Sequence, residues 1–170
     1  MGIFNWLFGK KNRHLIQENG VCEIYSDNGT VWNNKGICLR SMRRYNEAIK
    51  CHDKAICLDE EWDYAWTSKG TTLASLDQWK EALKCFDNAI KLDKKYYEAW
   101  NNKGYSSFKL GYLQAAIKCY NKSIKINPKY VVPWNNKADL FYSMKKYDKA
   151  KRVSEHVLHL NPKNQYAKRF

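Results

Sequence analysis

The side chains that most often carry catalysis or bind metals are few in this sequence, and they lie far apart. Its four histidines are His14, His52, His156 and His159. His156 and His159 share a predicted helix with Glu155, but no further ligand stands at metal-binding spacing. The sequence contains neither a glycine-rich phosphate loop nor a nucleophile elbow. It therefore predicts a protein that is not an enzyme, with no catalytic residue, metal site, cofactor or small-molecule substrate.

Cysteine is the next residue type that could carry chemistry, and six cysteines are present. Three of them, Cys51, Cys85 and Cys119, are spaced 34 residues apart, and the sequence contains no C-x-x-C pair. Disulfide frameworks are typical of short secreted chains, and zinc sites of close cysteine pairs. We therefore expect half-buried thiols in a reducing compartment. Because the sequence shows no secretion signal or membrane span, we expect a cytoplasmic protein.

The spacing of 34 residues also orders the apolar residues, which points to internal repeats. Four tryptophans keep this spacing, and so do small residues that follow them: Trp32, Trp66, Trp100 and Trp134, then Gly36, Gly70, Gly104 and Ala138, and then Ala48, Ala82, Ala116 and Ala150. Within one copy, Trp66 and Leu73 recur at helical spacing, as do Phe86 and Ile90. Each copy therefore predicts two amphipathic helices of about 13 residues, joined by a short turn.

In this order and period, the residues resemble the tetratricopeptide repeat family. The opening of each copy reads WNNKG, WTSKG, WNNKG and WNNKA, with lysine where the family commonly has leucine. The resemblance implies an all-α fold, a right-handed superhelix of stacked antiparallel helix pairs that binds other proteins. It assigns the four repeats to residues 29–62, 63–96, 97–130 and 131–164. We expect residues 1–28 to hold an apolar and basic tip and a degenerate capping helix, and residues 165–170 to form a short basic tail.

The resemblance also places an extended peptide in a concave groove, on the exposed face of the first helix of each repeat. The expected peptide-binding residues are Asn33, Asn34, Tyr64, Asn101, Asn102, Tyr105, Phe108, Asn135, Asn136 and Tyr142, and the second repeat adds Thr67, Ser68, Thr71, Ala74 and Ser75 to this face. A carboxamide can pair with both the N–H and the C=O of a peptide backbone. Alternatively, the asparagines serve only local hydrogen bonding. The residues by which chaperone-binding members clamp a C-terminal carboxylate are absent.

The net charge of +13 is uneven. Residues 1–96 hold 15 basic and 13 acidic side chains, whereas residues 97–170 hold 15 basic and 4 acidic ones, a net charge of +11. Most of these basic residues map to the second helices and turns, away from the groove, where the simplest interpretation is a solvated outer surface. The next interpretation is that they attract an acidic partner protein. An alternative function is peripheral binding to an anionic membrane or acidic partner through the apolar residues 3–8 and the basic second half. An RNA-associated scaffold is the least favoured interpretation, because few aromatic residues interleave the lysines.

The last predicted helix carries apolar residues that no later repeat covers, namely Val153, Val157, Leu158 and Leu160. An uncovered apolar surface at the end of a repeat array tends to pair with another copy. We therefore expect weak homodimers, opposed by the positive charge of this region.

Overall fold

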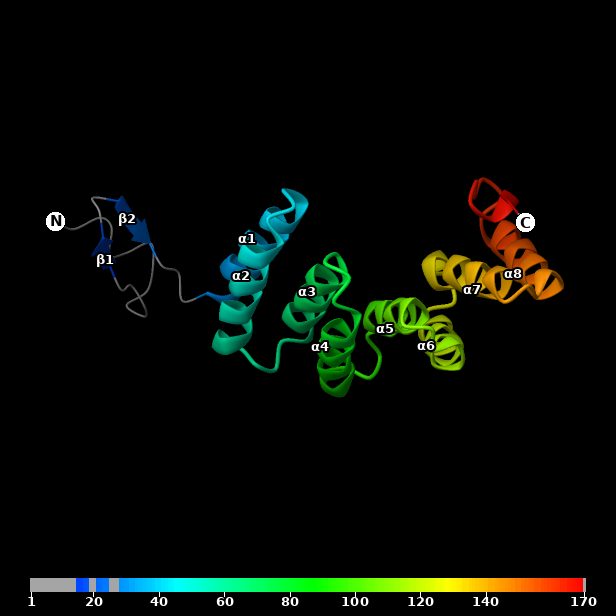
Figure 1. Ribbon diagram of the computed structural model, residues 1–170, viewed down its shortest axis with the longest axis horizontal. Helices are drawn as coiled ribbons and strands as arrows, with labels where there is room; N and C mark the ends of the chain where they lie inside the picture. The colour runs from blue at the N-terminus through cyan, green and yellow to red at the C-terminus, as the bar shows by residue number, and fades with distance from the viewer. Residues whose placement is uncertain (1–14, 19–20, 25–27, 170) are drawn as a thin grey trace.

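Eight α-helices follow one another in the part of the chain that the computed structural model describes, namely residues 15–18, 21–24 and 28–169. They pack as four adjacent pairs: α1 (Gly29–Ser41) with α2 (Tyr45–Leu58), α3 (Asp63–Ala74) with α4 (Trp79–Leu92), α5 (Tyr97–Lys109) with α6 (Leu113–Ile126), and α7 (Val131–Ser143) with α8 (Tyr147–Leu160). The pairs stack in chain order along the long axis of the molecule (Figure 1). The predicted all-α array of stacked helix pairs is confirmed.

A recurring turn ends each pair. The residue after the second helix accepts a hydrogen bond on its side-chain oxygen from the backbone N–H two residues later, at Asp59, Asp93, Asn127 and Asn161. Three tryptophan side chains form hydrogen bonds at the junctions between pairs, namely those of Trp66, Trp100 and Trp134. Each donates its Nε1–H to the backbone carbonyl six residues earlier, at 3.0–3.2 Å. These tryptophans thus fasten each connecting turn to the helix that follows, which gives their spacing a structural reason.

The turn inside each pair has a left-handed residue at the same repeat position. Its φ is 58–79°, at Arg43, Asp77, Gly111 and Lys145. Glycine adopts this conformation at little cost, whereas a residue with a Cβ is strained there. Gly111 takes this left-handed conformation just after the end of α5.

The helices of a pair touch through a small residue that faces a ring. A Cβ added at Gly36, Gly70 or Gly104 would lie 2.6–2.7 Å from a ring atom of the facing His52, Phe86 or Tyr120, respectively. Each ring is almost completely buried. The fourth pair has Ala138 in place of the glycine and Ser154 in place of the ring. The larger residue on α7 is thus compensated by a smaller one on α8.

Lysine side chains join each pair to the one before it. The three contacts are Lys69 to Asp53, Lys103 to Asp87 and Lys137 to Asn121. Each lysine ammonium also lies over the ring of the tryptophan three residues earlier. The last junction lacks an ion pair at this position, because an asparagine stands where the other two have an aspartate.

One side of the stack consists of first helices alone. The helix α1 contacts α3, α3 contacts α5, and α5 contacts α7, whereas α2, α4 and α6 each pack between their own partner and the first helix of the next pair. Elements that approach one another across successive repeats lie on the inside of the curve of a repeat array. We call this surface, formed by α1, α3, α5 and α7, the inner wall.

The N-terminal part differs from the expectation. In place of a capping helix, the strands β1 (Leu15–Glu18) and β2 (Val21–Ile24) form an antiparallel hairpin. The strands contain β-branched residues, and the sequence between them, Asn19-Gly20, is typical of a two-residue hairpin connection. The prediction of a capping helix was therefore wrong. The apolar tip, residues 3–8, lies outside the described residues.

The residues after α8 fold back and pack on that helix. They end in a short 3₁₀ helix, η1 (Ala167–Arg169), in which Ala167 is buried. Arg169 forms an ion pair with Asp139 of α7 at 3.3 Å. Val157 is fully buried, whereas Leu160 stays 42% exposed. The segment expected to be only a basic tail therefore covers part of the apolar end of the array.

Candidate functional site

Three of the predicted peptide-binding residues do not present their side chains freely on the inner wall. Asn33 is completely buried, and its Oδ1 lies 2.8 Å from Nδ1 of His52. Asn101 is also buried. Phe108 is half-buried and packs against the core around Tyr120. The assignment of Asn33 and Asn101 to direct peptide contact was therefore wrong, because both belong to the side of the helix that faces neighbouring helices.

The other predicted residues remain accessible to different degrees. Four have exposed side chains: Asn34, Tyr64, Tyr105 and Tyr142. Three are half-buried: Asn102, Asn135 and Asn136. The accessible residues lie on all four first helices, so they follow the inner wall from one end to the other.

Three asparagine side chains form a directed chain of hydrogen bonds across α7 and α5. Nδ2 of Asn136 donates to Oδ1 of Asn101 at 2.9 Å, and Nδ2 of Asn101 donates to Oδ1 of Asn102 at 3.1 Å. At one end of this chain stands an amide N–H of Asn102, and at the other end stands Oδ1 of Asn136. Neither group forms a hydrogen bond among the described residues. Hydrogen bonds in a chain polarise one another. The chain therefore offers a donor and an acceptor on neighbouring first helices.

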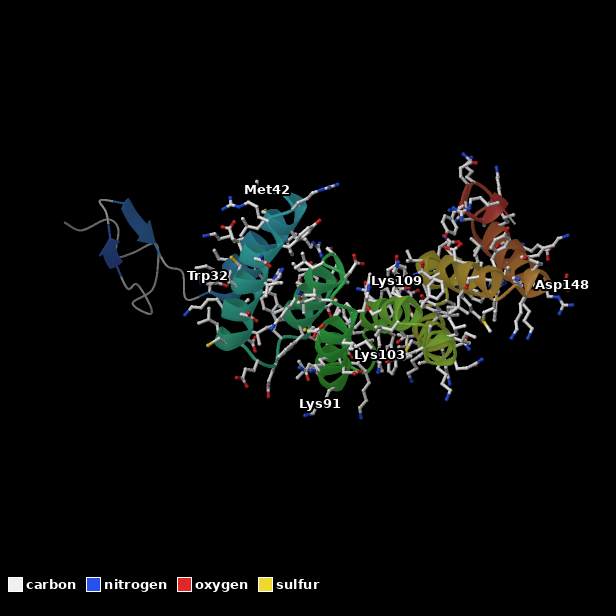
Figure 2. All side chains as sticks on the ribbon, viewed as in Figure 1. Trp32, Met42, Lys91, Lys103, Lys109 and Asp148 are labelled. Atoms are coloured by element: carbon white, nitrogen blue, oxygen red, sulfur yellow. The ribbon has the colours of Figure 1, made fainter. Side chains whose placement is uncertain are left out.

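A pocket of about 310 Å³ opens on the inner wall between α3 and α5. Its lining comprises Thr71, Ala74, Ser75, Trp79, Phe86, Asn102, Tyr105 and Ser106. The rings of Trp79 and Tyr105 meet edge to face with their centroids 5.8 Å apart. Nζ of Lys109 lies 5.5 Å from the centroid of the Trp79 ring. Figure 2 labels Lys109, which is the last residue of α5.

Trp79, Phe86 and Ser106 line this pocket although the sequence did not assign them to the groove. A signal for Trp79 was present, because Tyr45 and Tyr147 occupy its position in two other repeats. Three bulky rings at the first residue of a second helix indicate a shared surface beside the inner wall. Ser106 gave no comparable signal.

The positive charge lies mainly on the second helices and the turns beside them. Nine basic residues of the second half are exposed there: Lys118, Lys122, Lys125, Lys129, Lys145, Lys146, Lys149, Lys151 and Arg152. Lys122 and Lys149 extend over the rings of Trp100 and Phe141, respectively, at 6.0 Å. The inner wall therefore lies beside a strongly basic surface, as the sequence had indicated.

Among the described residues, no three histidine, cysteine, aspartate or glutamate side chains gather closely enough to hold a metal ion. Burial lowers the pKa of His52 to about 4, so its imidazole is neutral at pH 7. Burial raises the pKa of Cys85 to about 11, and a protonated thiol is a poor nucleophile. None of the described helices combines the length and the apolar character required to cross a bilayer.

Comparison with protein families matches three models to the repeat region. A model described as tetratricopeptide repeat matches residues 30–61 and 97–130, a TPR repeat model matches residues 70–111, and a further tetratricopeptide repeat model matches residues 119–152. No match was found among curated protein sequences.

Solved structures share the fold at low sequence identity. The crystal structure of MamA superposes with a TM-score of 0.73 at 22% identity, over 81% of this chain and 80% of that chain. MamA from Desulfovibrio magneticus RS-1 gives 0.73 at 18% identity, over 82% of this chain and 79% of that chain. The first TPR of Spaghetti (RPAP3), bound to the HSP90 peptide SRMEEVD, gives 0.67 at 22% identity, over 71% of this chain and 96% of that chain.

Proposed function

Because the chain belongs to the tetratricopeptide repeat family, we propose that it is a non-catalytic adaptor that holds an extended segment of another protein on its inner wall. Tetratricopeptide repeat domains are in general protein-binding scaffolds, and a structural neighbour is bound to a peptide. The proposal places the adaptor in the cytoplasm, where its buried thiols stay reduced.

The single observation that carries the proposal is the asparagine chain from Asn136 to Asn102. An extended peptide presents backbone N–H and C=O groups in alternation, and the two ends of the chain offer one acceptor and one donor. The proposal draws on both interpretations of the asparagines. Asn101 serves local hydrogen bonding, and by doing so it orients the two residues that are available to a ligand.

Aromatic side chains beside the asparagines supply contact area. Tyr105 and Tyr142 are 41% and 54% exposed, and Tyr142 packs edge to face with Tyr147 at 5.1 Å. Tyrosine combines apolar area with a hydroxyl and is frequent at energetic centres of interfaces. An acidic segment would be attracted by the charge of +11 on residues 97–170.

The test begins with a pull-down from a cell extract that identifies a partner, whose binding segment is then made as a peptide. We expect Asn102→Ala combined with Asn136→Ala to weaken binding of that peptide by at least tenfold, since two hydrogen bonds of about 1 kcal/mol each are lost. The matched control is Lys118→Ala combined with Lys122→Ala, which changes two exposed residues of α6. Unchanged affinity in the asparagine variant, at an unchanged melting temperature, would exclude the inner wall as the binding site.

The exposed lysines support a second candidate, which is binding to an anionic membrane surface or acidic protein through α6 and α8. Its affinity should fall more steeply as salt rises than that of the inner wall, where asparagine and tyrosine contacts add to the attraction between charges. In this case the lysine control, and not the asparagine variant, would lose affinity. The RNA-associated alternative predicts the same salt dependence with a nucleic acid as the ligand.

A further inference from the structure

The pocket between α3 and α5 exists because one small residue interrupts a row of large ones. Ala74 stands at the repeat position that Arg40, Phe108 and Tyr142 occupy in the other first helices. At the next junction, the larger Phe108 packs into the core around Tyr120. At the junction of α3 and α5, Ala74 leaves the space beside Trp79 unfilled, and the pocket of about 310 Å³ results.

The lining of the pocket contains a polar group that the protein itself leaves unsatisfied. Ser106 is only 1% exposed, and its Oγ has no hydrogen-bond partner among the described residues. Because this hydroxyl is enclosed by the protein, it offers no contact to a ligand in the pocket. An amide N–H of Asn102, which also lines the pocket, lacks a partner in the same part of the chain.

The remaining walls favour a flat ring. Trp79, Phe86 and Tyr105 surround the pocket, and aromatic rings attract one another through edge-to-face and offset contacts. The rim is cationic, because the ammonium of Lys109 lies over the Trp79 ring. The positive second half of the chain adds to this charge. A ring with a polar tip, next to a negative charge, would complement all of these features.

We propose that this pocket binds a tyrosine side chain of the captured peptide, with an aspartate or glutamate next to that tyrosine in the sequence. The ring packs beside the Trp79–Tyr105 pair, and the phenolic oxygen accepts a hydrogen bond from the amide N–H of Asn102. The carboxylate of the neighbouring residue approaches Lys109. This inference rests on the proposed function and adds to it the kind of residue that the inner wall recognises.

The experiment uses a synthetic library of nine-residue peptides in which the central residue is fixed in turn as each amino acid and the other positions are mixed. Fluorescence polarisation measures the binding of each pool to the full chain. We expect the tyrosine pool to bind about fivefold more tightly than the phenylalanine pool, the difference that one hydrogen bond provides. In Asn102→Ala, the two pools should bind equally.

The decisive variant is Ala74→Phe, which fills the pocket as Phe108 fills the next junction while leaving Asn102 and Asn136 intact. We expect it to bind all pools with similar affinity. Ala115→Phe, at an exposed position of α6, adds the same side chain elsewhere and should retain the preference for tyrosine. Ala74→Leu repeats the test with a smaller side chain if the phenylalanine variant has a lower melting temperature.

The outcomes separate the pocket from the function as a whole. Peptides that bind without a preference for tyrosine, or a preference that survives in Ala74→Phe, would refute the pocket assignment and leave the adaptor proposal standing. If no pool binds to the unchanged protein, the proposed function fails and the pocket assignment fails with it.

Discussion

Lowering the pH should destabilise the first two helix pairs through one buried histidine. Nδ1 of His52 lies 2.8 Å from Oδ1 of Asn33, and Nε2 lies 3.1 Å from Oγ1 of Thr72. Thr72 donates its own hydrogen to the carbonyl of Ser68 at 2.9 Å, so it accepts from Nε2–H of the ring. In the neutral ring, Nδ1 then needs a donor. Nδ2 of Asn33, which has no partner among the described residues, supplies one when the amide rotates by half a turn.

Protonation of His52 disturbs this arrangement and costs free energy. Burial lowers the pKa of His52 from 6.5 to about 4, and the charge of Arg40 adds to the effect, while Asp53 opposes it. Because the pKa is lower in the folded state, the unfolded chain binds the proton more tightly, and stability falls as the pH decreases. The stability that depends on a neutral His52 is fully present above about pH 7 and is lost as the pH falls from 6.5 to about 4. The full difference corresponds to about 3 kcal/mol, of which rotation of the Asn33 amide recovers a part.

Urea unfolding of the wild type and of His52→Phe at several pH values isolates this contribution. Phenylalanine suits the position, because Phe86 occupies it in the second repeat. Both proteins share the same carboxylates, so the difference between their pH dependences belongs to the histidine. We expect the wild type to lose about 2 kcal/mol more than the variant between about pH 7.5 and pH 4.5. Parallel pH dependences, or a His52 pKa near 6.5 by nuclear magnetic resonance, would refute the reasoning.

Three further predictions concern the repeat array. Asn121→Asp should give Lys137 the ion pair that the other junctions have and raise the free energy of unfolding by about 0.5–1 kcal/mol, with the gain reduced in high salt. Positions 77 and 111 both have positive φ, which glycine adopts more readily than a residue with a Cβ. Asp77→Gly should therefore stabilise the protein by a similar amount, and Gly111→Ala should destabilise it by about 1 kcal/mol, both measured by chemical denaturation. Weak self-association through the exposed Leu160 should strengthen as salt screens the positive charge, and sedimentation would show a monomer at all salt concentrations if residues 163–169 suffice as a cap.

The sequence predicted the repeat array well because each repeating residue has one structural role that its type reveals. Trp66 fastens the connecting turn, Gly70 allows close approach to the ring of Phe86, and Gly111 takes a left-handed conformation. The N-terminal segment was predicted less well. The capping helix expected within residues 1–28 gives way to the hairpin of β1 and β2, because β-branched residues and the Asn19-Gly20 pair favour strands joined by a tight turn.

The candidate site was predicted only in part, because the register identifies a helix face with an uncertainty of about one residue. Asn101 and Asn102 are neighbours in sequence, yet the first is buried and the second lines the pocket. Their difference depends on how closely α5 and α7 pack, which the sequence alone does not specify. The pocket had a visible signal in Ala74, whose small size departs from the row of large residues at its position.

The central claim is that the inner wall, and not the basic second helices, binds the partner. The most direct test is a titration of ¹⁵N-labelled protein with the partner peptide, followed through the side-chain amide signals of Asn102 and Asn136 and the backbone signals of α3, α5 and α7. We expect these signals to shift together with the indole N–H of Trp79, while those of Lys118 and its neighbours on α6 remain in place. Shifts confined to α6 and α8, with the two asparagine amides unchanged, would contradict the central claim.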